Sequence, residues 1–144
     1  MAEKTAMLTA LSDVKTKNKI IMSKTFTLLC GDNFVITTGA QDISNHENGA
    51  YTGDISGTML KKAGVKYVLV GHSERRINHN ETNKIIKAKA TMAIKNGITP
   101  IICIGETATE KKSGKTILVI KKMISECAPN TGKYIIAYEP IWAI

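Results

Sequence analysis

Short apolar runs alternate with helix-like segments along most of this chain, and this alternation constrains the fold more than any other feature. Strands are predicted at residues 34–41, 65–70, 98–104 and 134–138, and helices at about 80–96 and at 116–127. The run at 98–104 is almost continuously apolar, as in a strand that is buried on both faces. Strand–helix–strand order gives a parallel sheet with right-handed crossovers. The sequence therefore predicts an α/β fold.

Local signals define several helix ends and faces. Ser56 is expected to cap a short helix that ends at Gly64, because serine favours the N-cap and glycine the C-terminal end. Residues 107–110 match a capping box that opens a short helical turn. The first long helix is predicted to carry one apolar stripe, formed by Ile85, Ile86, Ala90, Ala93 and Ile94. The second is predicted to direct Ile117, Ile120 and Ile124 inward. The lysines are expected on polar helix faces: Lys84, Lys87, Lys89 and Lys95.

The first 33 residues carry weaker patterns. An amphipathic helix is suggested by Met7, Leu8, Leu11 and Val14, and a strand remnant by residues 19–22. We find no repeat, low-complexity tract or internal boundary. We therefore expect a single domain over residues 1–144, in which residues 1–33 form a poorly defined N-terminal remnant.

Charge and cysteine content limit the classes of function. The formal net charge is +8, but most of the basic residues are lysines and only 5% of the residues are aromatic, which favours a solvated surface over a nucleic-acid site. No apolar run approaches the length of a membrane span, and we find no secretion signal. Three widely spaced cysteines, Cys30, Cys103 and Cys127, are typical of reduced thiols in the cytoplasm. We expect a cytoplasmic protein that binds neither nucleic acid nor membrane.

Two polar side chains follow apolar strands and are the candidate reactive groups. His72 comes directly after Gly71 at the end of the 65–70 strand, and Glu139 directly follows the 134–138 strand. Active sites of parallel barrels lie at the carboxyl ends of the strands, and an adjacent helix N-terminus disfavours a positively charged imidazole. Taken singly, such a histidine is more often a capping or hydrogen-bonding residue, and such a glutamate is usually solvated.

Five motifs in one order give the pair its context. They are Gly39–Ser44, Asn48–Ser56, Gly71–Arg76 (GHSERR), Cys103–Thr107 and Ala137–Ile144 (AYEPIWAI). Together they closely resemble the triosephosphate isomerase family, from roughly Phe26 to the C-terminus. The resemblance implies a partial TIM (β/α)8 barrel, because a complete barrel takes about 250 residues and this chain has 144. It also implies that the chain stops within the lid loop.

The resemblance implies an activity and two catalytic residues. The family interconverts dihydroxyacetone phosphate and D-glyceraldehyde 3-phosphate by proton transfer through an enediolate, a step of glycolysis and gluconeogenesis. Glu139 stands at the position of the base, and His72 at that of the neutral imidazole that polarises the carbonyl, an assignment that belongs to the family. No cofactor or metal is implied, because this proton transfer uses side chains only. The implied partners are a small phosphorylated triose and a second copy in a homodimer.

Several further residues take roles from the same resemblance. Ser73 is expected to cap the helix after His72, and Glu74 to contact the catalytic lysine unless it is simply a favourable first-turn charge. Cys103 is expected to be buried near the base, with a packing role far more plausible than a nucleophilic one. Pro140 and Trp142 correspond to the lid hinge, and the alternative for Trp142 is an interfacial aromatic.

The expected dimer loop contains Gly49, Tyr51, Thr52 and Gly53, and Arg75 belongs with it through a predicted ion pair with Asp54. Without a partner, residues 49–56 would be an ordinary surface loop.

Two expected parts of the family's site have no counterpart in the sequence. We find no strand followed by the Asn-x-Lys segment that carries the catalytic lysine, and no match to the loops that hold the phosphate. We therefore expect the chain alone to be nearly inactive. A second hypothesis is a non-catalytic half-barrel that acts as an assembly or complementation module. A third, a basic nucleic-acid-binding domain, depends on charge alone.

Overall fold

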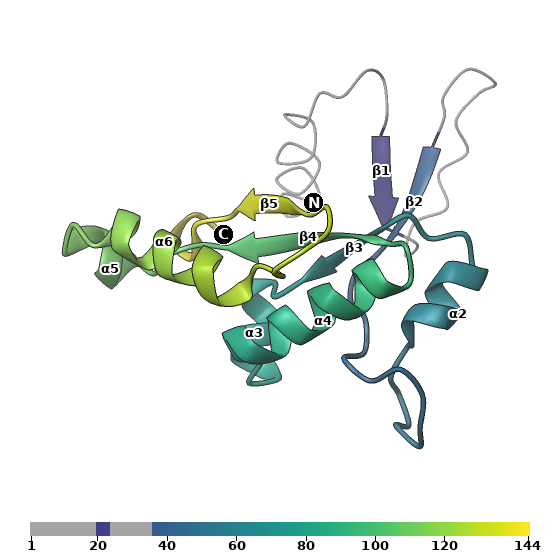
Figure 1. Cartoon of the computed structure of the whole chain (residues 1–144). Coiled ribbons are helices and arrows are strands. Elements are labelled where there is room, and N and C mark those ends of the chain that lie inside the picture. Colours follow the sequence, from purple (N-terminus) through teal and green to yellow (C-terminus); the bar gives the residue numbers. More distant parts are fainter. Residues whose placement is uncertain (1–19, 24–35) are drawn as a thin grey trace.

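The chain forms a five-stranded parallel sheet (Figure 1). The structure is a computed structural model that describes residues 20–23 and 36–144. The strands follow one another across the sheet in chain order: β1 (Ile20–Ser23), β2 (Ile36–Ala40), β3 (Tyr67–Val70), β4 (Thr99–Ile104) and β5 (Ile135–Tyr138). Each neighbouring pair is parallel. This sequential order is that of a barrel wall, so the prediction of a partial barrel is confirmed.

Five α-helices and one short 3-10 helix connect or follow the described strands: α2 (Gly57–Lys62), α3 (Ser73–Asn78), α4 (Asn83–Lys95), α5 (Ala108–Lys112), α6 (Thr116–Cys127) and η1 (Ile141–Ala143). The Ser56 cap of α2 is confirmed, since its side chain accepts the Met59 N–H. The capping box of α5 is also present, and α6 has the predicted bounds. The suggested helix near Met7–Val14, Cys30 and residues 34–35 of the first strand lie outside the described residues.

Three boundary differences lie next to helix ends. The strands start at Tyr67 and Thr99, later than predicted, because the residues assigned to their starts serve the preceding turns: Val65 N–H donates to Leu60 and Ile98 N–H donates to Ala93. The helix predicted from residue 80 begins at Asn83 instead, and Thr82 caps it. Asn80 precedes it in the left-handed region, with φ 54°, a conformation that ends a turn rather than starting a helix.

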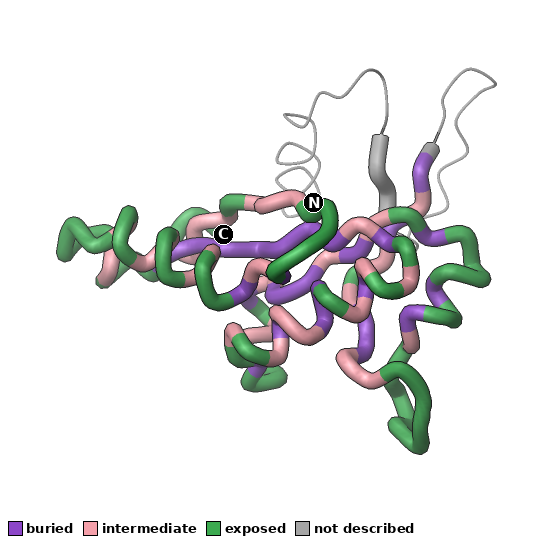
Figure 2. The backbone as a smooth tube through the Cα atoms, in the orientation of Figure 1, coloured by how far each residue is buried: buried purple, intermediate pink, exposed green. Residues whose placement is uncertain are grey.

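The core lies between the sheet and helices α4 and α6, where the buried segments of the tube meet (Figure 2). Strands β3 and β4 contribute Val68, Val70, Ile102 and Ile104, and α4 contributes Ile86, Ala90 and Ala93. The predicted stripe of α4 is therefore confirmed at its centre, while Ile85 and Ile94 are half-buried. Ile120 and Ile124 of α6 pack against the core, but Ile117 is 66% exposed. The prediction for Ile117 was wrong because the first turn of α6 extends beyond the core.

Lys89 does not belong to a polar helix face, and its assignment there was wrong. Only 5% of the residue is exposed. Its ammonium lies 2.6 Å from Glu81 Oε1 and 2.7 and 2.8 Å from the two carboxylate oxygens of Asp42. A buried charge is tolerated when it is paired and hydrogen-bonded, and here Asp42 comes from the loop after β2. This partner is distant in sequence, so the helical pattern alone did not reveal the pairing.

Candidate functional site

His72 and Glu139 meet at the carboxyl edge of the sheet. His72 follows β3 and Glu139 follows β5, so one strand, β4, separates the two. His72 Nε2 lies 3.2 Å from Glu139 Oε2, and the side chains are 23% and 27% exposed. The fold therefore brings together the two residues that the sequence predicted as base and electrophile, and leaves both partly exposed.

The imidazole of His72 is held by the start of helix α3. His72 is the N-cap residue, and its Nδ1 accepts a hydrogen bond of 3.3 Å from the Glu74 N–H. An accepting Nδ1 carries no proton, so the proton of the neutral ring sits on Nε2, which faces Glu139. The prediction that Ser73 caps this helix was wrong. Ser73 is the first helical residue and is buried, because the cap falls one position earlier.

Glu139 changes the electrostatics that the helix alone would set. Its hydrogen bond raises the pKa of His72, while burial acts in the opposite direction. A carboxylate beside an imidazole favours the charged form. The sequence argument considered the helix N-terminus, which disfavours that form, and did not include the carboxylate. The two side chains therefore form a hydrogen-bonded pair in which the carboxylate of Glu139 favours the protonated form of His72.

Gly105, to which the sequence analysis assigned no role, makes room for the backbone of Glu139. The Glu139 N–H donates to the Ile104 carbonyl oxygen at 2.8 Å. A Cβ placed on Gly105 would overlap the carbonyl oxygen of Glu139 and crowd the Pro140 Cα. Only glycine permits such a close approach of two backbones. A glycine directly after a buried strand was the signal that could have identified it.

Arg76 joins the ends of two strands and was also missed. Its Nε donates to the Gly71 carbonyl oxygen at 2.7 Å, and its Nη2 donates to that of Cys103 at 3.1 Å. Nη1 donates to Asn83 Oδ1 at 2.6 Å. The guanidinium thus fixes the turn that carries His72 against β4 and the first turn of α4. The five fixed donors of arginine suit this role.

Cys103 is buried, as the sequence predicted, and the charge of Glu139 acts on its thiol. Burial, followed by the charge of Glu139, raises the pKa of its thiol to about 12. Reactive cysteines have a lowered pKa and a partly exposed sulfur. The environment of Cys103 therefore favours packing over nucleophilic chemistry.

Arg75 makes different ion pairs from the one predicted. Its guanidinium lies 2.9 Å from Asp42 and 2.7 Å from Glu81. Asp54 instead accepts a hydrogen bond of 2.7 Å from the Ser44 hydroxyl. The predicted Arg75–Asp54 pair was wrong because Asp54 is held within its own loop, while Arg75 faces the charged cluster around Lys89. Glu74 is largely exposed in the first turn of α3, which fits the simpler of its two interpretations.

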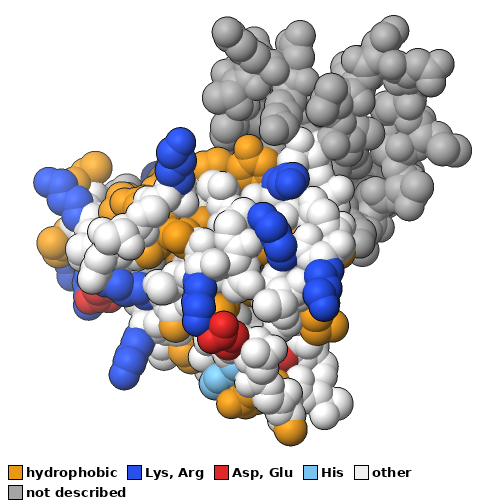
Figure 3. All heavy atoms as spheres, turned by 45° about the vertical axis from the view of Figure 1, so that its right-hand side comes forward, with side chains coloured by type: hydrophobic (Ala, Val, Ile, Leu, Met, Phe, Trp, Pro, Cys, Tyr) orange, Lys and Arg blue, Asp and Glu red, His pale blue; other side chains and the backbone are white. Residues whose placement is uncertain are grey.

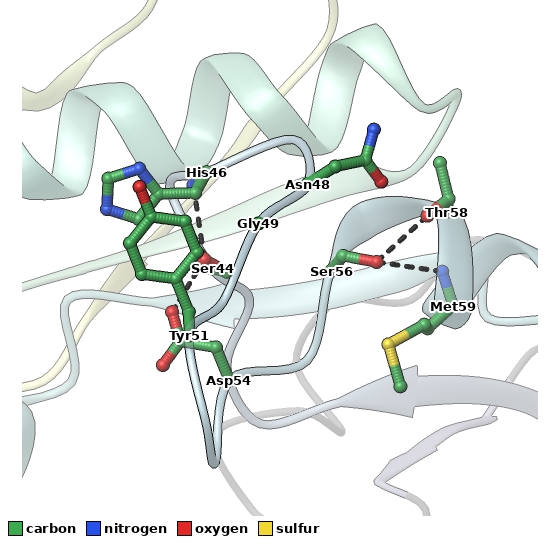
Figure 4. Close-up of a pocket in the computed structure, with 9 residues that line it drawn as sticks. All are labelled: Ser44, His46, Asn48, Gly49, Tyr51, Asp54, Ser56, Thr58 and Met59. Atoms are coloured by element: carbon green, nitrogen blue, oxygen red, sulfur yellow. Dashed lines mark hydrogen bonds between the residues drawn. The ribbon is translucent and has the colours of Figure 1, made fainter.

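The loop between β2 and α2 surrounds a pocket of about 220 Å³ (Figure 4). The rings of His46 and Tyr51 stack with their centroids 3.9 Å apart. Gly49 adopts φ 142° and leaves space for the Tyr51 ring, because a Cβ there would come within 2.6 Å of it. The predicted dimer-loop residues Thr52 and Gly53 are exposed. The pocket does not include His72 or Glu139, so it is separate from the pair predicted from the sequence.

The segment after Glu139 is anchored to Glu106, a residue with no predicted role. Glu106 is 1% exposed and accepts hydrogen bonds from Trp142 Nε1 at 3.0 Å and from the Tyr138 hydroxyl at 3.0 Å. The Trp142 hydrogen bond is the main cause that lowers the pKa of Glu106, and burial opposes it. Pro140 precedes η1, in which Trp142 lies. A carboxylate that follows a buried strand was the available signal.

Other kinds of site find little support among the described residues. Within residues 20–23 and 36–144, no three His, Cys, Asp or Glu side chains gather as a metal site would require. No helix in the same ranges is long and apolar enough to cross a membrane. Lysine and arginine side chains stand apart from one another on the face seen in Figure 3, and they form no continuous basic stripe there.

Comparison with known proteins decides the family. The family model described as triosephosphate isomerase matches residues 1–144. The chain belongs to the triosephosphate isomerase family. It is 52% identical over 122 residues to the triosephosphate isomerase of Cutibacterium acnes and 55% identical over 107 residues to that of Mycoplasmopsis pulmonis. These matches cover 81% and 73% of this chain, but only 47% and 43% of the two relatives.

A solved structure agrees with this membership. The crystal structure of triosephosphate isomerase from Bartonella henselae superposes with a TM-score of 0.76 at 36% identity, covering 98% of this chain and 62% of that one. The chain thus spans about half the length of the curated relatives it matches. The segment that it shares with this family contains both His72 and Glu139.

Proposed function

We propose that this chain carries the proton-transfer pair of a triosephosphate isomerase and acts on a small phosphorylated triose. The observation that carries the proposal is the 3.2 Å approach of His72 Nε2 to Glu139 Oε2 across β4. A general base must lie within hydrogen-bond reach of the proton that it moves. Both groups are half-buried, so a substrate can enter between them and take the place of their direct contact.

The chemistry follows from the two side chains. The Glu139 carboxylate removes a proton from the carbon next to the substrate carbonyl, and the electron pair moves to form an enediolate. The Nε2–H of His72 donates to the carbonyl oxygen and stabilises the charge that develops there. Glu139 then returns a proton to the neighbouring carbon, which interconverts dihydroxyacetone phosphate and D-glyceraldehyde 3-phosphate.

Two further residues, Arg76 and Gly105, position the His72–Glu139 pair. Arg76 fixes the turn that presents His72, and Gly105 admits the Glu139 backbone against β4. Small displacements of catalytic groups cost large factors in rate. We assign Arg76 and Gly105 as positioning residues for His72 and Glu139, respectively.

A coupled isomerase assay tests the proposal. We expect the purified 144-residue chain alone to turn over glyceraldehyde 3-phosphate slowly, because the matched region covers 47% of the Cutibacterium acnes relative. Adding a separately produced segment that carries the unmatched part of that relative is expected to increase the rate. Glu139→Gln should abolish this increase, and Lys84→Met, an exposed change on α4, should not. An equal rate with Glu139→Gln would overturn the assignment of the base.

The alternative is a non-catalytic half-barrel that assembles with complementary strands. It is supported by the position of β5 at the end of the sheet in the described part of the chain, where it pairs with β4. This interpretation predicts a stable complex with the added segment but no isomerase activity. Size-exclusion chromatography and the coupled assay together separate it from the first proposal.

We also propose that the loop containing Gly49, Tyr51, Thr52 and Gly53 contacts a second copy in a homodimer. Three exposed apolar side chains support this interface: Tyr51, Ile55 and Met59. Sedimentation of Tyr51→Asp is expected to show a shift toward monomer, since a charge in an apolar interface is costly. An unchanged dimer would contradict this use of the loop.

We place the protein in the cytoplasm, as a single domain over residues 1–144. The free, buried thiols of Cys103 and Cys127 support a reducing compartment.

A further inference from the structure

Helix α5 makes no contribution to the core. None of its residues, Ala108–Lys112, is buried. Nevertheless, a capping box holds its start: the Thr107 side chain accepts the Glu110 N–H, and the Glu110 carboxylate accepts the Thr107 N–H at 2.8 Å. A short helix that buries nothing gains little from packing. The capped first turn of α5 therefore needs an explanation other than packing against the core.

One side chain of this helix lies over an aromatic ring. The Lys111 ammonium is 3.1 Å from the centroid of a Trp142 ring. The indole Nε1–H donates to Glu106 Oε1 at 3.0 Å. Trp142 is thus held by the cation over its face and by the buried carboxylate at its edge. The residue remains 44% exposed, so these two contacts are specific rather than a result of general burial.

The two contacts act in the same direction. A cation over the face of tryptophan is attracted by the negative face of the ring. The cation also polarises the indole, which makes its N–H a better donor to Glu106, since linked polar contacts strengthen one another. Glu106 and Lys111 are connected through the capped turn at Thr107, so their spacing is fixed by the backbone.

We propose that Lys111 is a positioning residue that clamps Trp142 against Glu106 and thereby fixes the segment that follows Glu139. Only Pro140 and Ile141 stand between Glu139 and Trp142, and η1 has no side-chain cap of its own. The clamp replaces that cap with contacts from α5. Helix α5 then serves to hold the segment after β5 in place. This role accounts for the capped first turn of α5 and for its exposed surface. This inference does not depend on the proposed isomerase activity.

Trp142 is the single tryptophan of the chain, so its fluorescence reports the clamp directly. We would compare acrylamide quenching and near-ultraviolet circular dichroism in Lys111→Met, Lys111→Arg and the matched control Lys112→Met. Lys112 lies on the same exposed helix. Loss of a half-exposed cation–π contact shifts the equilibrium between held and released indole by about two- to fivefold. Lys111→Met should therefore raise quenching and weaken the near-ultraviolet signal. Lys111→Arg and Lys112→Met should resemble the parent.

A double-mutant cycle gives an independent measurement. The free energy of unfolding would be measured for Lys111→Met, Trp142→Phe and the double variant. Coupling between the two positions that exceeds the coupling of Lys112 with Trp142 supports the clamp. Parent-like quenching in Lys111→Met, or equal effects of Lys111→Met and Lys112→Met, would overturn it. Far-ultraviolet spectra confirm that each variant is folded, and the surface position of Lys111 favours this.

Discussion

The carbonyl oxygen of Glu139 occupies the space where a Cβ on Gly105 would lie. The oxygen belongs to the backbone, and the position of a Cβ is fixed by the backbone, so neither can rotate away. Gly105→Ala is expected to displace the Glu139 backbone and to lower the free energy of unfolding by about 1–3 kcal/mol, as overpacking does. The side chain of Glu139 should move with its backbone and lose the hydrogen bond to His72. Nuclear magnetic resonance titration of His72 should then show a pKa closer to its ordinary value.

Gly114→Ala is the matched control for this substitution. Gly114 has φ 68°, but no other atoms lie within 4 Å of the position that a Cβ would take. An alanine there costs about 1–2 kcal/mol of backbone strain, without contact to the site. Its His72 titration should match that of the parent. A parent-like His72 pKa in Gly105→Ala would show that Glu139 is not held by this close approach.

The His72–Glu139 contact predicts a pH dependence of stability. The pKa of His72 is raised in the folded state, chiefly by the Glu139 hydrogen bond. A raised pKa stabilises the fold fully below the unfolded-state value of about 6.5, and this contribution is lost as pH rises through the folded-state pKa. The free energy of unfolding, measured with urea on both sides of this window, should decrease toward alkaline pH.

The change should be smaller in Glu139→Gln, because the neutral amide no longer favours the imidazolium. His46 and His79 are present in both proteins, so the difference between the two profiles isolates His72. Identical profiles would mean that the carboxylate does not control the proton of His72.

The ammonium of Lys89 is the centre of a buried charge cluster. It contacts Asp42 and Glu81, and Glu81 itself is 7% exposed. Lys89→Met would leave the Glu81 carboxylate buried with only Arg75 beside it. Removing one partner of a buried ion pair costs about 3–5 kcal/mol. Lys84→Met, on the exposed side of α4, should stay within about 0.5 kcal/mol of the parent. Urea unfolding of the two variants tests the contrast, and equal small losses would show that the cluster adds no stability.

How far the sequence predicted this molecule depends on the range of each interaction. Ser56, the Thr107 capping box and the α6 bounds depend on neighbours within a few residues, and all three are confirmed. The parallel order of β2 to β5 follows from the alternation of strands and helices. The approach of His72 to Glu139 follows from parallel topology, because strand ends meet at one edge.

The errors at Lys89 and Arg75, and the two residues that were missed, arise from contacts between distant segments. Lys89 resembles any polar helix residue until Asp42, from another loop, reaches it. Arg75 was paired with Asp54 on family resemblance, yet Ser44 holds Asp54 within its own loop. Gly105 and Arg76 act on backbone atoms of other strands, and a sequence pattern does not show which backbone lies beside them.

The thiol of Cys103 provides a last test of the site's environment. With a pKa of about 12, it is ionised in about one molecule in ten thousand near pH 8, and only the thiolate is a good nucleophile. Iodoacetamide near pH 8 should therefore leave Cys103 unmodified in the folded protein, as measured by peptide mass spectrometry. The same reagent should label it readily in concentrated guanidinium chloride, which is the control for access. If Cys103 is labelled at the same rate in both states, the site is open and polar, and the close packing of β4 against Glu139 described above is incorrect.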